Sequence, residues 1–234
     1  MKRFQNKVSL ITGGNKGIGR AIALRLASEG SSIILFGRNE KDNQSVEKEI
    51  SSTYSVPVKS YNVDMSSKKS VEEGIGQAMS HFRRLDVLIN NAGICRLSTP
   101  FTEIKEEDWK ETLSVNLYGV IYVTGLVIPY LKKEGGKIIN IASLAGEVGG
   151  IATSADYVAS KAALQGITKS LARELGVKHI NVNAMAPGRA GPAGKLRRMA
   201  GKVFRLFFFV KATRCTSWTS QGGGEPEAAE WKGK

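Results

Sequence analysis

Cysteine and histidine are scarce in this sequence, and long apolar runs are missing. The residues of these two types are Cys95, Cys215, His81 and His179. Two cysteines are too few for a disulfide framework, which fits a reducing compartment, and so few thiols and imidazoles argue against a His/Cys metal site. No run approaches the ~18 apolar residues of a membrane helix, and the N-terminus lacks the apolar core of a secretory signal. We therefore expect a cytoplasmic protein with no metal site and no membrane segment.

Acidic residues are scarce near the C-terminus, where the net charge of +13 is concentrated. Residues 189–234 hold ten Lys or Arg against three Asp or Glu, a net charge of +7, whereas the first 188 residues hold 24 against 18, a net charge of +6. A basic balance attracts nucleic acids or anionic cofactors. No nucleic-acid-binding module is recognisable, so no nucleic-acid partner is expected. The asymmetry indicates that the C-terminal segment differs from the body of the chain.

Short runs rich in Val, Ile and Leu alternate with helical patterns through the first 188 residues. The predicted strands cover residues 7–12, 32–36, 56–63, 85–90, 136–141 and 180–184. The predicted helices cover residues 20–28, 42–52, 67–82 and 155–176, with two long helices within 106–133. This alternation predicts an α/β fold with a doubly wound, Rossmann-type parallel sheet, and the near-continuous apolar strands indicate burial on both faces. Six strands are clear, and a seventh is expected to be missing.

A glycine-rich turn follows the first predicted strand. Gly13, Gly17 and Gly19 lie where this strand ends and the next helix begins. Glycine lets the backbone approach a pyrophosphate closely, and a helix N-terminus attracts its negative charge. An ordinary strand–helix turn is the alternative, but the position after the first strand of an alternating pattern favours phosphate binding.

The spacing Gly-x3-Gly-x-Gly resembles that of the short-chain dehydrogenase/reductase family. Further motifs of that family stand in the same order: Asn90-Asn91-Ala92-Gly93, Asn116, Ser143, Tyr157-x3-Lys161 and Pro187-Gly188. The resemblance covers residues 7–188, and within the family the sequence resembles bacterial-type 3-oxoacyl-[acyl-carrier-protein] reductases. It implies an NAD(P)-binding catalytic domain over residues 1–188, a homo-oligomer, and hydride transfer between nicotinamide and a carbonyl or secondary alcohol. A 3-oxoacyl thioester is one substrate class that it suggests.

The end of the second predicted strand indicates which nicotinamide cofactor binds. NAD-preferring Rossmann sites place an acidic residue there, next to the ribose 2′-hydroxyl. This chain has Arg38 instead, which would pair with a 2′-phosphate, and Lys16 in the glycine turn would contact the same group. The sequence therefore predicts NADP(H).

The resemblance also implies a set of contacts with the cofactor. It places Asp64 over the adenine ring, Ala92 and Gly93 beside a ribose, and Pro187-Gly188 near the nicotinamide carboxamide, while Asn90 bonds backbone across strands. The whole predicted set is Gly13, Asn15, Lys16, Gly17, Ile18, Gly19, Arg38, Asp64, Asn90, Ala92, Gly93, Tyr157, Lys161, Pro187 and Gly188.

Four residues form the predicted catalytic group. Tyr157 and Lys161 are four apart in a predicted helix and share one face of it, so the ammonium is expected to favour the phenolate. Such a tyrosine acts as an acid in carbonyl reduction and as a base in alcohol oxidation. Ser143, at the end of the fifth strand, would donate to the substrate carbonyl oxygen. Asn116 matches the fourth member of the family's group, which holds a water next to the lysine.

Several of these residues also have a plain structural interpretation. Arg38 and Lys16 would be solvated surface cations, and Asp64 a helix cap at a strand end. Cys95 follows the Asn90-Asn91-Ala92-Gly93 motif without a histidine partner, and we interpret it as a pocket or core thiol.

The pattern of alternating elements stops after Gly188. Residues 189–234 lack the Thr-containing loop, covering helices and seventh strand with which family members continue, and they include a basic stretch and a Phe207-Phe208-Phe209 run. We predict an atypical, poorly ordered tail from an altered reading of the C-terminus, against the alternative of a genuine lid. Loss of the covering helices would leave the substrate site wet and the sixth strand an exposed edge. The alternative function is therefore a catalytically impaired or regulatory variant of the same family.

Overall fold

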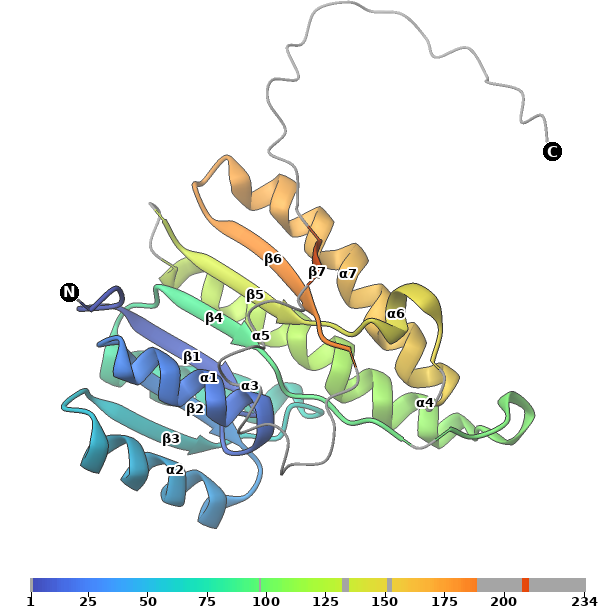
Figure 1. The fold of residues 1–234 in the computed structure, drawn as a ribbon, viewed down its shortest axis with the longest axis horizontal. Helices are drawn as coiled ribbons and strands as arrows, with labels where there is room; N and C mark the ends of the chain where they lie inside the picture. The colour runs from blue at the N-terminus through green and yellow to red at the C-terminus, as the bar shows by residue number, and fades with distance from the viewer. Residues whose placement is uncertain (1, 97, 132–134, 151–152, 189–207, 211–234) are drawn as a thin grey trace, which may run out of the picture.

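The computed structural model describes residues 2–96, 98–131, 135–150, 153–188 and 208–210. Its centre is a sheet with the strand order β3-β2-β1-β4-β5-β6-β7, in which β1 to β6 all run parallel (Figure 1). The chain moves outward from β1 in one direction and then crosses to β4 and continues in the other. This is the doubly wound, Rossmann-type arrangement that the sequence predicts.

The strands and helices lie close to their predicted positions. The strands are β1 (Val8–Thr12), β2 (Ser32–Gly37), β3 (Val58–Asn62), β4 (Val87–Asn90), β5 (Lys137–Ile141), β6 (Asn181–Ala186) and β7 (Phe208–Val210). The α-helices are α1 (Gly17–Ser28), α2 (Glu40–Thr53), α3 (Lys68–Phe82), α4 (Glu106–Leu113), α5 (Gly119–Val127), α6 (Ala145–Val148) and α7 (Ala155–Gly176). Shorter helical turns are η1 (Phe101–Glu103), η2 (Ser114–Tyr118) and η3 (Ile128–Tyr130).

Each face of the sheet is covered by its own helices. Successive side chains of a strand point to opposite faces, so Leu10 packs with α3, α5 and α7 while its neighbour Ile11 packs with α1 and α2. Ile34 and Leu35 of β2 divide in the same way, and all four side chains are fully buried. Burying each of them contributes about 1.5–3 kcal/mol to folding. Burial on both faces explains the near-continuous apolar strands.

Parallel pairing brings the carboxyl ends of the strands to one edge of the sheet. Thr12 at the end of β1 is level with Phe36 of β2, and Asn90 at the end of β4 is level with Asn140 of β5. The loops that follow β1, β2, β4 and β5 therefore emerge side by side. Every predicted functional motif before residue 150 except Asn116 lies in or next to these loops or the one after β3.

The segment predicted as two long helices within 106–133 is a continuous helical stretch interrupted by a π-helical turn. α4 passes into η2 at Ser114, and η2 passes into α5 at Gly119. A π-helical turn marks a functional site in many helices, and this one contains Asn116. A Cβ at Gly119 would lie only 2.6 Å from the backbone oxygen of Met65, so only glycine permits this close approach.

The same stretch, Glu106–Tyr130, contains an 18-residue window with a mean hydropathy of 1.5, so it is long and apolar enough to cross a membrane, whereas the sequence predicts no membrane segment. Because it packs against α3 and α7, and because buried core helices meet the same criterion, this is weak evidence for a membrane segment.

A short seventh strand corrects the expectation that this strand is missing. β7 pairs antiparallel with β6, in a register that places Met185 opposite Phe209. A run of Phe and Val has high strand propensity, and the outer edge of β6 offers unpaired backbone groups, so pairing is favourable without the family's usual continuation. The predicted poor order of the rest of the tail concerns residues 189–207 and 211–234, which lie outside the described residues.

Two glycines of α3 provide a matched test of the packing. A Cβ at Gly74 would lie 2.5 Å from a methyl group of Val63, whereas a Cβ at Gly76 would meet nothing within 4 Å. We expect Gly74→Ala to lower the free energy of unfolding by about 1–3 kcal/mol through overpacking. Gly76→Ala is expected to raise it by about 0.5–1 kcal/mol through helix propensity. Urea unfolding measures both, and equal effects of the two substitutions would contradict this packing.

Candidate active site

The turn between β1 and α1 leaves the N-terminus of α1 open to an anion. The N-cap residue, Lys16, makes no side-chain cap bond, and the first turn of α1 contains no acidic residue. Gly13 adopts a left-handed backbone conformation (φ +62°), and a Cβ at Gly19 would collide with the Gly13 carbonyl. A Cβ at Gly17 would meet nothing within 4 Å. Free N–H groups and open space at a helix N-terminus suit a pyrophosphate.

Asn91 and Thr12 hold this turn against the end of β4. The Asn91 amide Nδ2 donates to the backbone oxygens of Thr12 and Gly13, each at 3.0 Å. In return, the Thr12 hydroxyl accepts from the backbone N–H groups of Asn91 and Ala92, also at 3.0 Å. The sequence identifies Asn91 only as part of a motif and gives no signal for Thr12.

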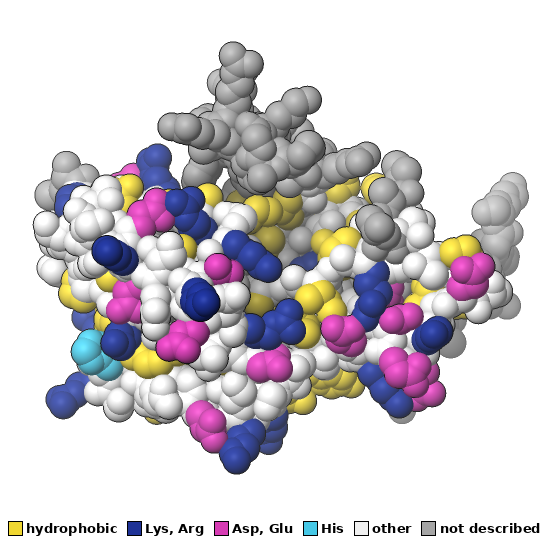
Figure 2. Space-filling model, turned by 90° about the horizontal axis from the view of Figure 1, so that it is seen from below, with side chains coloured by type: hydrophobic (Ala, Val, Ile, Leu, Met, Phe, Trp, Pro, Cys, Tyr) yellow, Lys and Arg dark blue, Asp and Glu magenta, His cyan; other side chains and the backbone are white. Residues whose placement is uncertain are grey.

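A cavity of about 240 Å³ lies between the glycine turn and the ends of β2, β3 and β4. Its lining combines the predicted cofactor residues Gly13, Asn15, Lys16, Arg38, Asp64, Ala92 and Gly93 with Phe36, Gly37, Asn39, Asp42, Val63, Met65, Ile94 and Val115. On the face shown in Figure 2, basic and acidic side chains are interspersed, with no single-sign patch among the side chains drawn in colour. An open helix N-terminus, close-approach glycines and cations at one cavity fit a phosphorylated dinucleotide.

Arg38 and Lys16 reach this cavity from two different turns. Neither cation forms an ion pair within the part of the chain that the structure describes. Asp64 also lines the cavity, and its carboxylate accepts from the backbone N–H of Ser66 at 3.0 Å and from the Ser66 hydroxyl at 2.8 Å. Asp64 therefore has both the position expected for a ligand contact and the role of a turn-stabilising carboxylate.

Lys161 is a buried cation within the predicted catalytic group. Its side chain is 4% exposed, and Nζ donates to the carbonyl of Ile141, at the end of β5, at 2.8 Å. The ammonium lies 5.8 Å from the centre of the Tyr157 ring. Burial lowers the pKa of Lys161 to about 8. A Cβ at Gly93 would lie 3.4 Å from Nζ, so the ammonium borders the cavity wall.

Asn116 connects the loop after β4 to the helix that contains Tyr157. Its Oδ1 accepts from the Ile94 N–H at 2.8 Å, and its Nδ2 donates to the Ile94 carbonyl at 2.9 Å and to the Ser160 hydroxyl at 3.0 Å. The Ser160 hydroxyl donates to the Tyr157 carbonyl at 2.7 Å. Ser160 is a further positioning residue that sequence reasoning missed, because a serine within a helix gives no local signal.

The sequence predicts that the Lys161 ammonium lowers the pKa of Tyr157, but the pKa of Tyr157 is raised. Burial raises the pKa of Tyr157, while a hydrogen bond with Ser143 acts in the opposite direction and Cys95 adds to the increase. The spacing of four residues places tyrosine and lysine on one helix face but does not report how much water surrounds the phenol. A raised pKa keeps the phenol protonated, as proton donation to a carbonyl oxygen requires.

Of two further predicted cofactor contacts, Asn90 lies outside the cavity lining and Pro187-Gly188 lies beside Ser143. The Asn90 side chain is 1% exposed and donates to Thr124 Oγ1 at 3.1 Å and to Asn140 Oδ1 at 2.8 Å, so it bonds side chains and not the predicted backbone. It is not among the cavity-lining residues. Pro187-Gly188 does lie at the catalytic edge, because the Pro187 carbonyl accepts from the N–H of Leu144, next to Ser143, at 3.1 Å.

Cys95 is an exposed thiol beside this group. Its Sγ donates to the carbonyl of Arg96 at 3.5 Å. Partial burial raises the pKa of the thiol, the Asp156 carboxylate acts in the same direction, and Lys161 opposes both. The thiol therefore stays protonated. Its exposure excludes the core position of the predicted pocket or core thiol, and it is not among the residues that line the cofactor cavity.

Comparison with known proteins gives the same picture. A model of the short chain dehydrogenases matches residues 7–194. A 3-oxoacyl-[acyl-carrier-protein] reductase of Aquifex aeolicus is 39% identical over 187 residues, which are 80% of this chain and 75% of the relative. A 3beta-hydroxysteroid dehydrogenase of Mediterraneibacter gnavus is 34% identical over 189 residues, 80% of this chain and 67% of the relative. Among solved structures, an NAD+-bound xylitol dehydrogenase superimposes with a TM-score of 0.78 at 33% identity, covering 85% of this chain and 76% of that one.

A parallel sheet with an open glycine turn and a Ser-Tyr-Lys group at its carboxyl edge defines a Rossmann-type, NAD(P)(H)-binding oxidoreductase that transfers a hydride. More particularly, the chain belongs to the short-chain dehydrogenase family.

The buried ammonium predicts that Lys161→Met stabilises the protein while abolishing activity. Because the folded-state pKa, about 8, is below the ordinary 10.5, the unfolded chain binds the proton more tightly. Stability therefore rises with pH between about 8 and 10.5, and below that window the buried charge costs roughly 3 kcal/mol. We expect the variant to gain about 1–3 kcal/mol of unfolding free energy at pH 7, less the lost Ile141 bond, and to lose this advantage by pH 10.5. Urea unfolding at both pH values measures it, and a pH-independent difference would contradict it.

Proposed function

We propose that this protein is an NADP(H)-dependent reductase of ketones, working in reverse on secondary alcohols. The observation that supports this most directly is the proximity of Ser143, Tyr157 and Lys161 to one another. The Lys161 ammonium in turn lies next to Gly93, in the wall of the cavity that Arg38 and Lys16 line. Bound NADPH would supply a hydride at nicotinamide C4. The chain's own residues supply the proton, the orientation of the carbonyl and the site for the cofactor.

Each catalytic side chain has a distinct task in this proposal. The Tyr157 hydroxyl donates its proton to the carbonyl oxygen as negative charge develops there, and the Ser143 hydroxyl donates a hydrogen bond to the same oxygen. The Lys161 ammonium stabilises the resulting phenolate and binds ribose hydroxyls. Asn116 fixes the helix position of Tyr157 through Ser160.

The preference for NADP(H) is supported by the charge at the end of β2. Arg38 and Lys16 lack ion-pair partners among the described residues, and the end of β2 lacks the acidic residue of NAD-preferring sites. Arg38 would form charge-assisted bonds to a 2′-phosphate. The xylitol dehydrogenase was solved with NAD+ bound, so the fold alone does not select NADP(H). The proposed preference therefore rests on Arg38 and Lys16.

The substrate is proposed at the level of its chemistry. The relatives' names denote 3-oxoacyl thioesters, a hydroxysteroid and a sugar alcohol, which share a carbonyl or secondary alcohol. The 39% identity to a 3-oxoacyl-[acyl-carrier-protein] reductase favours a 3-oxoacyl thioester. A cytoplasmic homo-oligomer remains our expectation, and exposed Tyr118 and Ile121 on the η2–α5 stretch offer an apolar surface for it.

An impaired or regulatory member of the family is the second candidate. The match to the family model ends at residue 194, near the point where composition and pattern change. A protein of this kind would bind NADPH through the glycine turn and Arg38 but reduce no ketone, because its substrate site would remain wet.

A panel of ketones distinguishes the two candidates. We expect NADPH oxidation with at least one of an acetoacetyl thioester, a 3-ketosteroid and a hydroxyketone, with the thioester fastest. Tyr157→Phe is expected to lower kcat by about 10²–10⁴-fold because the proton donor is lost. Tyr130→Phe, at a surface tyrosine 41% exposed on η3, is the matched control and should retain activity. NADPH binding without turnover on any ketone would favour the impaired variant.

Charge reversal at Arg38 tests the cofactor preference. We expect Arg38→Asp to lower the ratio of kcat/KM for NADPH to that for NADH by about 10–100-fold, since a charge-assisted bond is lost. Lys41→Asp makes the same charge change on the surface of α2, outside the cavity lining, and should leave the ratio within about twofold of wild type, because exposed charges are screened. Equal use of both cofactors by the wild type would disprove the preference.

A further inference from the structure

We propose that Asn43 is a positioning residue for the 2′-phosphate subsite, because it joins the glycine turn to the turn that contains Arg38. The proposal rests on the NADP(H) preference proposed above. Asn43 lies in the first turn of α2 and is 2% exposed, so its amide is removed from water. A buried amide needs protein partners for both its oxygen and its nitrogen.

The Asn43 amide binds both turns at once. Its Oδ1 accepts from the Asn15 amide Nδ2, in the glycine turn, at 2.8 Å. Its Nδ2 donates to the carbonyl of Gly37, directly before Arg38, at 2.9 Å and to the carbonyl of Tyr61 in β3 at 3.3 Å. One side chain thereby fixes the relative position of the two turns that present Lys16 and Arg38 to the cavity.

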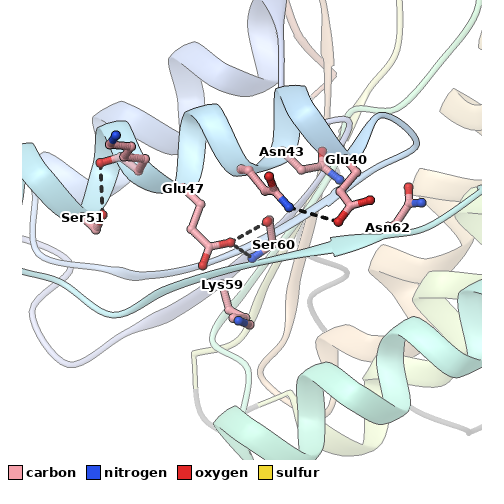
Figure 3. A pocket seen from close by; sticks show the side chains of 9 residues that line it. Glu40, Asn43, Glu47, Ser51, Lys59, Ser60 and Asn62 are labelled. Atoms are coloured by element: carbon pink, nitrogen blue, oxygen red, sulfur yellow. Dashed lines mark hydrogen bonds between the residues drawn. The ribbon is translucent and has the colours of Figure 1, made fainter.

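A second asparagine completes the support of the Arg38 turn. In the amide orientation that satisfies both of its polar atoms, Asn62 donates to the Arg38 carbonyl at 2.6 Å and to the Gly37 carbonyl at 3.0 Å. Figure 3 shows Asn43 on α2 and Asn62 on β3 at the same end of a polar cavity of about 470 Å³ between the two elements. The carbonyls of Gly37 and Arg38 are therefore hydrogen-bonded by two side-chain amides, that of buried Asn43 and that of exposed Asn62.

The packing around this amide leaves it little freedom. A Cβ at Gly37 would collide with Asn43 Oδ1 and would lie 2.5 Å from Asn15 Nδ2. The Arg38 turn thus rests directly on the Asn15–Asn43 bond, without side-chain atoms between them. A change at Asn43 must alter where Arg38 points, even though Asn43 does not line the cofactor cavity.

The experiment compares Asn43→Leu with Gln44→Leu in the intact chain. Both exchange an amide for a similar apolar side chain on α2, but the Gln44 amide is exposed and bonds only Glu40 among the described residues. The dissociation constants of NADPH and NADH are measured for each variant. We expect Asn43→Leu to weaken NADPH binding about tenfold more than NADH binding, whereas Gln44→Leu leaves both within about twofold.

A double variant distinguishes positioning from general damage. If Asn43 acts through Arg38, Asn43→Leu should change the NADPH/NADH ratio no further in an Arg38→Asp background. Equal weakening of both cofactors, or an undiminished effect without Arg38, would overturn the proposal. Asn43→Asp keeps the acceptor for Asn15 but loses the donor to Gly37. It replaces Asn43→Leu if that variant fails to fold, and we expect it to lose part of the preference for NADPH. If the wild type prefers NADPH and both Asn43 variants keep that preference, this inference is wrong and the proposed function stands. If the wild type does not prefer NADPH, the proposed cofactor preference is wrong as well.

Discussion

Parallel pairing of β1 to β6 is the constraint on which the site depends. It brings the ends of β1, β2, β4 and β5 to one edge, so that residues as far apart in sequence as Gly13 and Ile94 share a cavity. Burial of both faces beneath helices holds this arrangement, because a one-residue slip in register would exchange the side chains of the two faces and disrupt the packing of both clusters. The buried ammonium of Lys161, by contrast, opposes folding.

Hydrogen bonds from asparagine side chains fix the loops at that edge of the sheet. Asn91 holds the glycine turn to β4, Asn116 holds the loop after β4 to α7, and Asn43 holds the glycine turn to the end of β2. An amide both donates and accepts, so a single side chain satisfies a carbonyl of one loop and a donor of another. Several carbonyl groups of the loops around the cofactor cavity are therefore paired before any ligand binds, whereas the N–H groups at the N-terminus of α1 stay free for an anion.

Much of the fold followed from local patterns, and the site followed in part. Six strands and α7 were predictable because Val/Ile/Leu runs and helical spacing are local features, and the shared edge then followed from parallel topology. The π-helical turn around Asn116 was not, since no residue pattern separates it from an α-helix. β7 was missed because its pairing depends on a free edge elsewhere in the sheet. The roles of Thr12, Ser160 and Asn43 depend on partners distant in sequence or space, and the raised pKa of Tyr157 depends on burial that spacing does not report.

The transfer of a labelled hydride tests the central claim most directly. The intact protein would be incubated with NADPH carrying deuterium at both C4 positions and with an acetoacetyl thioester, and the product alcohol analysed by mass spectrometry. The account predicts one deuterium on the new carbinol carbon, together with one oxidised cofactor for each alcohol formed. Cofactor oxidation that yields unlabelled alcohol, or no alcohol at all from a protein that binds NADPH, would contradict it.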